Sequence, residues 1–188
     1  MFLTRPPSPA EIEQFLEQSK DLPLSYDQIE IAKASPPGFT VDEARSVIGH
    51  GKATYELAKD ALRNWRQFDL GWVELYPKGA SIEPGTVVAV LARHVRLWSL
   101  NACRVVRLLA AEQNRFGLVY GTLPNHAETG EELFEVSFDA RSGEVIYRIR
   151  AVSRPRAALA RLGYPLTRIL QQRFRRDSIA AMTRAVSI

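Results

Sequence analysis

The segment Arg115–Pro155, RFGLVYGTLPNHAETGEELFEVSFDARSGEVIYRIRAVSRP, carries the alternating pattern that decides the fold. Apolar side chains recur at every second position in three runs, as they do in strands with one buried face. Short polar segments that contain glycine separate the runs, which is typical of turns. The segment therefore predicts an antiparallel meander with one apolar face and one solvated face. The three runs lie at residues 116–122, 132–138 and 144–153.

A long amphipathic helix is predicted after this meander. Apolar residues recur at intervals of three and four from Leu166 to Ala181, and Pro165 suits the first turn of a helix. A short helical turn is expected just before it, at 157–162. A single long amphipathic helix can bury its apolar face only against another element. We therefore expect this helix to lie across the apolar face of the sheet.

The segments that precede the meander extend the same sheet. Their pattern predicts a strand, then a helix, then further strands with an irregular connection at 95–101. The predicted strands are 39–48, 70–76, 86–93 and 102–111, and the predicted helix is 52–65. We thus predict an α+β fold, in which a curved antiparallel sheet of about seven strands wraps around the C-terminal helix in one domain at 39–188. Residues 1–38 are expected to add a helix, which begins after a Ser8–Glu11 capping box, and an irregular arm, both packed on that domain.

Length and composition are those of a globular protein. The 188 residues fit one domain, and the chain is 46% hydrophobic. No apolar run approaches the roughly 20 residues of a membrane span, and the start lacks the pattern of a secretory signal. Cys103 is the only cysteine, which excludes an internal disulfide and a cysteine-based zinc site. These features predict a cytoplasmic protein in which Cys103 is a buried structural thiol.

Charge is distributed unevenly along the chain, whose net charge is +4. Residues 148–188 hold ten arginines and one acid, Asp177, whereas residues 1–46 hold four basic and eight acidic residues. Such asymmetry is found in proteins that bind nucleic acid or anionic lipid, and it also arises when the two ends of a chain attract each other. The arginines lack the interleaved aromatic residues of single-strand binding, which favours attraction between the ends.

The turn Gly49-His50-Gly51-Lys52 has to be compared with phosphate-binding loops, because it joins a predicted strand to a predicted helix. Position 54 holds threonine where the dinucleotide fingerprint has glycine. Position 46 holds serine and position 53 holds alanine, where the loop of nucleotide hydrolases needs glycine and a hydroxyl residue. We therefore expect no nucleotide at this turn, and the sequence predicts no cofactor.

Three blocks of the sequence resemble one family. They are IGHGKATYELAKDALRNW at 48–65, FGLVYGTLPNHAETGEELFEV at 116–136 and SRPRAALARLGYPLTRILQQRFRRDS at 153–178. These blocks are similar to bacterial and plant proteins grouped as uncharacterised protein family 0548, and the resemblance covers roughly Phe39 to Met182. Its most specific parts are Gly-Thr-Leu-x-x-His at 121–126 and Leu-Gly-Tyr-Pro at 162–165. The resemblance implies a family but no particular reaction.

The predicted layout is also similar to that of START and Bet v 1-like domains, in which a curved sheet grips a helix. In such a helix-grip layout, the space between sheet and helix can stay open as an apolar cavity. We therefore predict that the protein binds an apolar or amphipathic small molecule there, without catalysis and without a metal. The candidate ligand-binding residues are Trp65, Trp72, Tyr120, Thr122, His126, Phe134, Tyr147 and Tyr164.

Two other functions remain open. His126 and Glu132 belong to a polar cluster that would suit acid–base catalysis in a cyclase- or hydrolase-type enzyme, provided that they face a cavity. The same cluster also fits the solvated tip of a hairpin. A third interpretation is a basic surface for nucleic acid or anionic lipid on the C-terminal helix. That surface would consist of Arg168, Arg173, Arg175 and Arg176.

Overall fold

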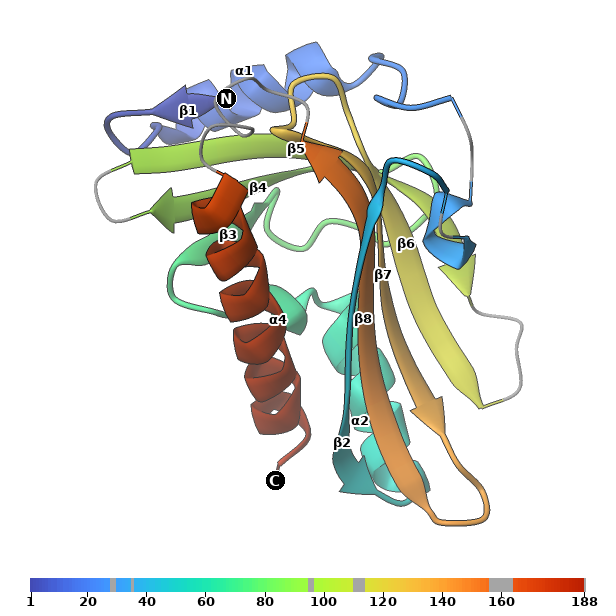
Figure 1. The fold of residues 1–188 in the computed structure, drawn as a ribbon. Helices are drawn as coiled ribbons and strands as arrows, with labels where there is room; N and C mark the ends of the chain where they lie inside the picture. The colour runs from blue at the N-terminus through green and yellow to red at the C-terminus, as the bar shows by residue number, and fades with distance from the viewer. Residues whose placement is uncertain (28–29, 35, 95–96, 110–113, 156–163, 188) are drawn as a thin grey trace.

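The computed structural model describes residues 1–27, 30–34, 36–94, 97–109, 114–155 and 164–187 (Figure 1). The strands in these residues are β1 (Phe2–Leu3), β2 (Thr40–His50), β3 (Val73–Tyr76), β4 (Val87–His94), β5 (Leu97–Leu109), β6 (Arg115–Thr122), β7 (Glu128–Phe138) and β8 (Glu144–Pro155). Within the described residues they form one antiparallel sheet in the order β2-β8-β7-β6-β5-β4-β3, with β1 beside β5. The sheet curves around a C-terminal helix, which confirms the predicted fold class.

The predicted meander consists of β6, β7 and β8, and its alternation is confirmed. Leu118 and Phe134 belong to the main core on the concave face of the sheet. Val119 and Leu133, each one position away, pack on the convex face instead. Strand β7 begins at Glu128, four positions before the predicted start, because residues 128–131 pair with residues 152–155 of β8. The polar segment between β6 and β7 is therefore shorter than predicted.

The connection predicted at 95–101 is wrong for residues 97–101, because β5 already begins at Leu97, and residues 95–96 lie outside the described part of the chain. Residues 97–101 pair with 90–94 of β4 in an unbroken antiparallel register. Ser99 and Asn101 make this stretch resemble a loop in the sequence. Both side chains are buried on the concave face, where other polar groups satisfy them.

Helix α4 (Tyr164–Val186) crosses the concave face of the sheet (Figure 1). Its C-terminal half is anchored, since Ser178 and Met182 are fully buried and Ser178 Oγ lies 2.9 Å from Tyr147 Oη. Helix α4 also contacts α2 (Lys52–Arg63) and the short 3-10 helix η2 (Arg66–Phe68). Residues 168–176 of α4 are only partly buried or exposed, so this half packs less closely on the sheet. The helical turn predicted at 157–162 lies outside the described residues.

The N-terminal residues cover part of the convex face. Helix α1 (Pro9–Ser19) begins with the predicted capping box and packs against β4 and β5. The 3-10 helix η1 (Ile31–Lys33) lies over β7, where the buried Glu131 accepts hydrogen bonds from Tyr26 Oη and from the backbone N–H of Ala32, both at 2.9 Å. The face that was expected to be solvated is therefore covered here by the arm. Strand β1 was not predicted because two residues are too few for a periodic pattern.

Ion pairs join the acidic N-terminal part of the chain to the arginines that follow. Asp42 and Glu43 lie next to each other in β2 and point to opposite faces, so each meets a different set of arginines. The attraction expected between the two ends of the chain is therefore present. All four arginines of the alternative basic surface are paired with acids, which weakens the case for that surface. Arg168 and Arg175 pair with the N-terminal acid Asp42, whereas Arg173 and Arg176 pair within α4. The pairs are Asp42 with Arg168 and Arg175, Glu43 with Arg148 and Arg150, and Asp177 with Arg173 and Arg176.

Candidate functional site

A cavity of about 440 Å³ lies between the concave face of the sheet and helix α4. Strands β3 to β8 contribute one wall, and residues 170–175 of α4 contribute the other, together with Phe68 of η2. Small-molecule sites in proteins commonly measure about 300–1,000 Å³ and combine an apolar lining with a few polar groups. The cavity falls within this range of volumes, and its lining combines aromatic rings with carboxyl, hydroxyl and imidazole groups.

One side of the cavity is aromatic. The rings of Phe68 and Phe174 lie 5.4 Å apart between centroids, and Tyr120 lies 6.3 Å from Phe68. Trp72 is fixed beside them because its Nε1 donates to Asp177 Oδ2 at 3.0 Å. The guanidinium of Arg173 covers the Trp72 ring at 4.4 Å. This side provides flat apolar surfaces that are held in place by α4 and η2.

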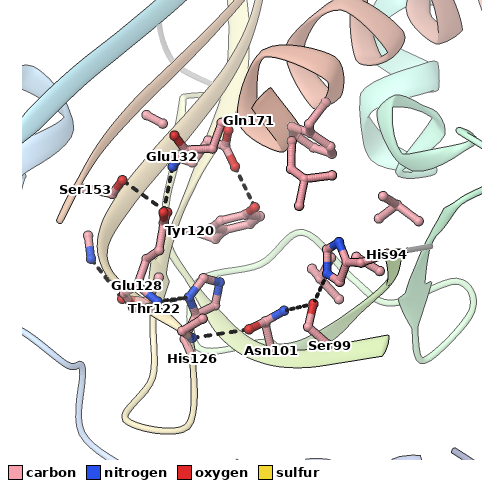
Figure 2. A pocket seen from close by; sticks show the side chains of 18 of the residues that line it. His94, Ser99, Asn101, Tyr120, Thr122, His126, Glu128, Glu132, Ser153 and Gln171 are labelled. Atoms are coloured by element: carbon pink, nitrogen blue, oxygen red, sulfur yellow. Dashed lines mark hydrogen bonds between the residues drawn. The ribbon is translucent and has the colours of Figure 1, made fainter. Parts of the chain in front are cut away.

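The polar side centres on Glu132 and on the hydroxyl of Tyr120, whose ring belongs to the aromatic side. Figure 2 shows the Tyr120 hydroxyl pointing at Glu132. This hydroxyl donates a hydrogen bond to Glu132 Oε2, and the two oxygens are 2.6 Å apart. Burial raises the pKa of the Glu132 carboxyl to about 7, although the Tyr120 hydrogen bond acts in the opposite direction. Near neutral pH this carboxyl therefore exists in both protonation states. Such a group can accept a hydrogen bond, donate one or transfer a proton.

Glu128 joins the sheet to the helix beside this pair. Its carboxylate accepts from Ser153 Oγ at 3.1 Å and from Gln171 Nε2 of α4 at 2.7 Å (Figure 2). Gln171 in turn accepts from Arg168 Nη1 at 3.0 Å. Burial raises the pKa of Glu128, while the two hydrogen bonds that it accepts lower it. Both carboxylate oxygens are thus occupied by protein donors.

His126 lies at the cavity rather than at a solvated hairpin tip, so that interpretation of the polar cluster is wrong. Its Nδ1 accepts from the backbone N–H of Glu128 at 2.9 Å, which leaves the ring hydrogen on Nε2. Burial, together with the nearby N-terminal ammonium group, lowers the pKa of His126 to about 4. The ring is therefore neutral at physiological pH. It offers a hydrogen-bond donor and no positive charge.

A chain of polar groups crosses the floor of the cavity. Asn101 Oδ1 accepts from the backbone N–H of Ala127 at 3.2 Å, and Asn101 Nδ2 donates to Ser99 Oγ at 3.1 Å. Ser99 Oγ lies 2.7 Å from His94 Nε2 (Figure 2). Among the described residues, His94 Nδ1 has no hydrogen-bond partner. Sequence reasoning missed Ser99 and Asn101 because it assigned them to a loop; alternation counted from 102–109 would have placed Asn101 on the concave face.

The structure brings together only part of the predicted residue set. Trp72, Tyr120, Thr122, His126 and Glu132 all line the cavity. Phe134 and Tyr147 do not line it, because they pack beneath it against Tyr120 and Ser178. Trp65 is buried elsewhere, with its Nε1 donating to Ala80 O at 2.9 Å. Tyr164 opens α4, and its side chain lies outside the described residues. Cys103 is fully buried, as predicted, and burial raises the pKa of its thiol.

Metal-ligating side chains are not clustered in the described part of the chain, where no group of three or more His, Cys, Asp or Glu residues is arranged to hold a metal ion. The described helices also lack the combination of length and hydropathy that a membrane span requires.

Comparison with known proteins identifies the family. A family model described as a domain of unknown function, DUF1990, matches residues 25–181. The chain belongs to this family. A UPF0548 protein of Dictyostelium discoideum is 32% identical and aligns over 99% of this chain and 96% of its own length. A UPF0548 protein of Deinococcus radiodurans is 36% identical over 98% of both chains. The resemblance predicted from the three sequence blocks is confirmed.

Several solved structures share the fold of this DUF1990 protein at low sequence identity. The hypothetical protein jhp0584 of Helicobacter pylori has a TM-score of 0.56 at 10% identity, over 87% of this chain and 98% of that one. Ara h 8.0201 has a TM-score of 0.50 at 16% identity, over 79% and 98%. The di-domain ARO/CYC BexL has a TM-score of 0.51 at 16% identity, over 85% of this chain and 53% of BexL. At these identities the likeness shows the DUF1990 domain to be a helix-grip fold and shows nothing about activity.

Proposed function

We propose that the protein binds an apolar or amphipathic small molecule in the cavity under α4, without changing it chemically. The observation that supports this proposal is the two-sided lining. Aromatic rings from η2 and α4 form one side, and a row of hydrogen-bonding groups from β5 to β8 forms the other. A cavity of this kind holds the body of a ligand by apolar burial and orients one end by polar contacts.

The shared fold adds support of a limited kind. Helix-grip neighbours show that a curved sheet and a long helix can stand in this arrangement in proteins of unrelated sequence. The BexL neighbour is named as an ARO/CYC protein, but a fold by itself does not carry a reaction. The proposal therefore depends on the cavity and its side chains.

Binding of the neutral fluorophore N-phenylnaphthylamine tests the proposal. We expect a fluorescence increase with a dissociation constant in the micromolar range, because the probe is apolar and small enough for the cavity. Replacing Ala151 by phenylalanine places a ring in the cavity next to Glu132, so A151F should weaken binding by about ten-fold or more. The matched control is A53F, which adds the same ring to an exposed position of α2 and should bind as the wild type does. Equal binding by A151F and A53F, both folded by circular dichroism, would place the probe elsewhere.

A second candidate is a cyclase- or hydrolase-type enzyme that uses Glu132 as its acid or base. The specific observation in its favour is a cavity-lining carboxyl whose pKa lies at about 7, within hydrogen-bond reach of a tyrosine hydroxyl. His126 would act there as a neutral donor rather than as a base. Turnover of p-nitrophenyl esters above background, lost in Glu132→Gln and retained in Glu56→Gln, would support catalysis. Turnover that is absent, or that survives Glu132→Gln, leaves the binding function in place.

A further inference from the structure

We infer that the molecule bound in this cavity carries a protonated amine at its polar end, placed against Glu132. This inference deepens the proposed function and rests on it. The chemical class of the ligand follows from which carboxylate oxygens of the cavity already accept hydrogen bonds from the protein.

Among the described residues, three glutamates line the cavity, and of these only Glu132 has a carboxylate oxygen without a hydrogen-bond partner in the described part of the chain. Both oxygens of Glu128 accept from Ser153 and Gln171. Both oxygens of Glu131 accept from the N-terminal arm on the far side of the sheet. Glu132 accepts from Tyr120 through Oε2 alone, and its Oε1 has no hydrogen-bond partner among the residues that the structure describes.

The acidic groups around Glu132 outnumber the basic ones, so one bound cation would balance the charge. Acidic groups come from its own strand, in Glu128, and from β2, in Asp42, while α4 contributes the positive charges of Arg168 and Arg175. Both arginines are already held by Asp42, and Arg175 Nη2 lies 3.2 Å from Asp42 Oδ1. The three carboxylates therefore exceed the two guanidiniums by one charge when all are ionised. The uncharged groups that face Glu132 are the hydroxyls of Tyr120 and Tyr147 and the thiol of Cys103.

An anionic ligand finds no comparable partner among the described residues that line this cavity. His126 and His94 also line it, but burial lowers the pKa of both rings, so they offer hydrogen bonds without charge. An anion would lie among the acidic groups of the cavity. It could pair with Arg175 only by competing with Asp42 for that guanidinium. A cation meets a favourable surface at the aromatic rings as well, because those of Phe174 and Tyr120 can face an ammonium group.

Binding of such a ligand should strengthen as the pH rises. A primary alkylamine, with a pKa near the roughly 10.4 of lysine, stays protonated from pH 6 to pH 8. Glu132 passes from mostly neutral to mostly ionised across that interval, since its pKa is about 7. The fraction of Glu132 that can pair with the amine thus rises about ten-fold, and affinity should follow it. His126 is already neutral at pH 6, so it does not contribute to the change.

Calorimetry with three probes of similar size tests the inference: naphthylethylamine, naphthylethanol and naphthylacetate. At pH 8 we expect the amine to bind about ten-fold tighter than the acetate, and its affinity to fall about ten-fold at pH 6. Glu132→Gln should remove both the preference and the pH dependence, while binding of the alcohol changes by less than about two-fold. The matched control, Glu56→Gln, alters an exposed carboxylate on α2 and should leave all three probes unaffected.

The outcomes separate the inference from the proposed function. Tightest binding of the acetate or the alcohol at pH 8, or a preference for the amine that survives Glu132→Gln, would overturn the inference and leave cavity binding intact. Binding of N-phenylnaphthylamine without binding of the amine would do the same. If neither N-phenylnaphthylamine nor any of the three probes binds, the proposed function fails together with the inference. The pH series on the wild-type protein does not depend on whether a variant folds.

Discussion

Replacing Asp42 by alanine should lower the free energy of unfolding by about 3 kcal/mol. Asp42 is only 7% exposed, and it holds Arg168 and Arg175 of α4 against β2. Removing the acid leaves the side chain of Arg175, which is 11% exposed, as a poorly solvated charge without this partner. Breaking one side of a buried ion pair costs more than the pair contributes, because the remaining charge stays away from water. Urea denaturation followed by circular dichroism measures the change.

The control for this prediction is Asp60→Ala. Asp60 also pairs with an arginine, Arg63, but its side chain is 64% exposed, so its loss should change stability by no more than about 0.5 kcal/mol. A loss of less than about 1 kcal/mol in D42A would show that the pairs at Asp42 are solvated and do not fix α4 to β2.

Replacing Glu132 by glutamine should stabilise the protein, and more so at high pH. The pKa of this carboxyl is about 7 in the folded state and 4.5 in its unperturbed state, so between these values the folded protein holds more protons than the unfolded chain. Stability of the wild type therefore falls as the pH rises from about 4.5 to about 7, and it stays lower above that range. Glutamine keeps an acceptor for Tyr120 but never ionises. We expect E132Q to gain on the order of 2 kcal/mol more at pH 8 than at pH 5.

Urea denaturation of the wild type, E132Q and E56Q at pH 5 and pH 8 tests whether E132Q gains more stability at the higher pH. Glu56 is an exposed carboxylate on α2, so E56Q should follow the wild type at both values. A gain that is equal at pH 5 and pH 8 would mean that Glu132 titrates as a solvated carboxyl. The pH dependence expected for amine binding would then be lost as well, because Glu132 would be ionised at both pH 6 and pH 8.

The order of elements could be predicted because the strands and α4 carry strong periodic signals. In β6 to β8, alternate positions face either the core or the convex side, and the sequence shows this directly. The long helix could be predicted from apolar residues that recur three and four positions apart. Its place across the face of the sheet followed because an amphipathic helix has to bury its apolar side. The strand at Asp42 and Glu43 was harder, because two adjacent acids weaken the alternation. Their ion pairs with distant arginines explain why they are tolerated.

The site could be predicted only in part from the sequence. A cavity is a space that two elements leave between them, and a residue pattern does not record such a space. Tyr120 and Tyr147 look alike in the sequence, since both lie on the concave face of neighbouring strands. Tyr147 is covered by the closely packed half of α4 through Ser178, whereas Tyr120 lies under the half that leaves the cavity open. Ser99 and Asn101 were read as loop residues because polar side chains in a strand are expected only on a solvated face. These two side chains can be buried in β5 because the polar groups at the floor of the cavity form hydrogen bonds with them.

A crystal structure of the protein with naphthylethylamine bound would locate both ends of the ligand. We expect the naphthyl ring between Trp72 and Phe174, and the amine within about 3 Å of the Glu132 carboxylate. The N-terminal half of α4 should remain over the ligand, held by Gln171 and Glu128. Electron density for the probe only on the outer surface, with side chains filling the space beside Tyr120, would show that the protein does not bind ligands under α4.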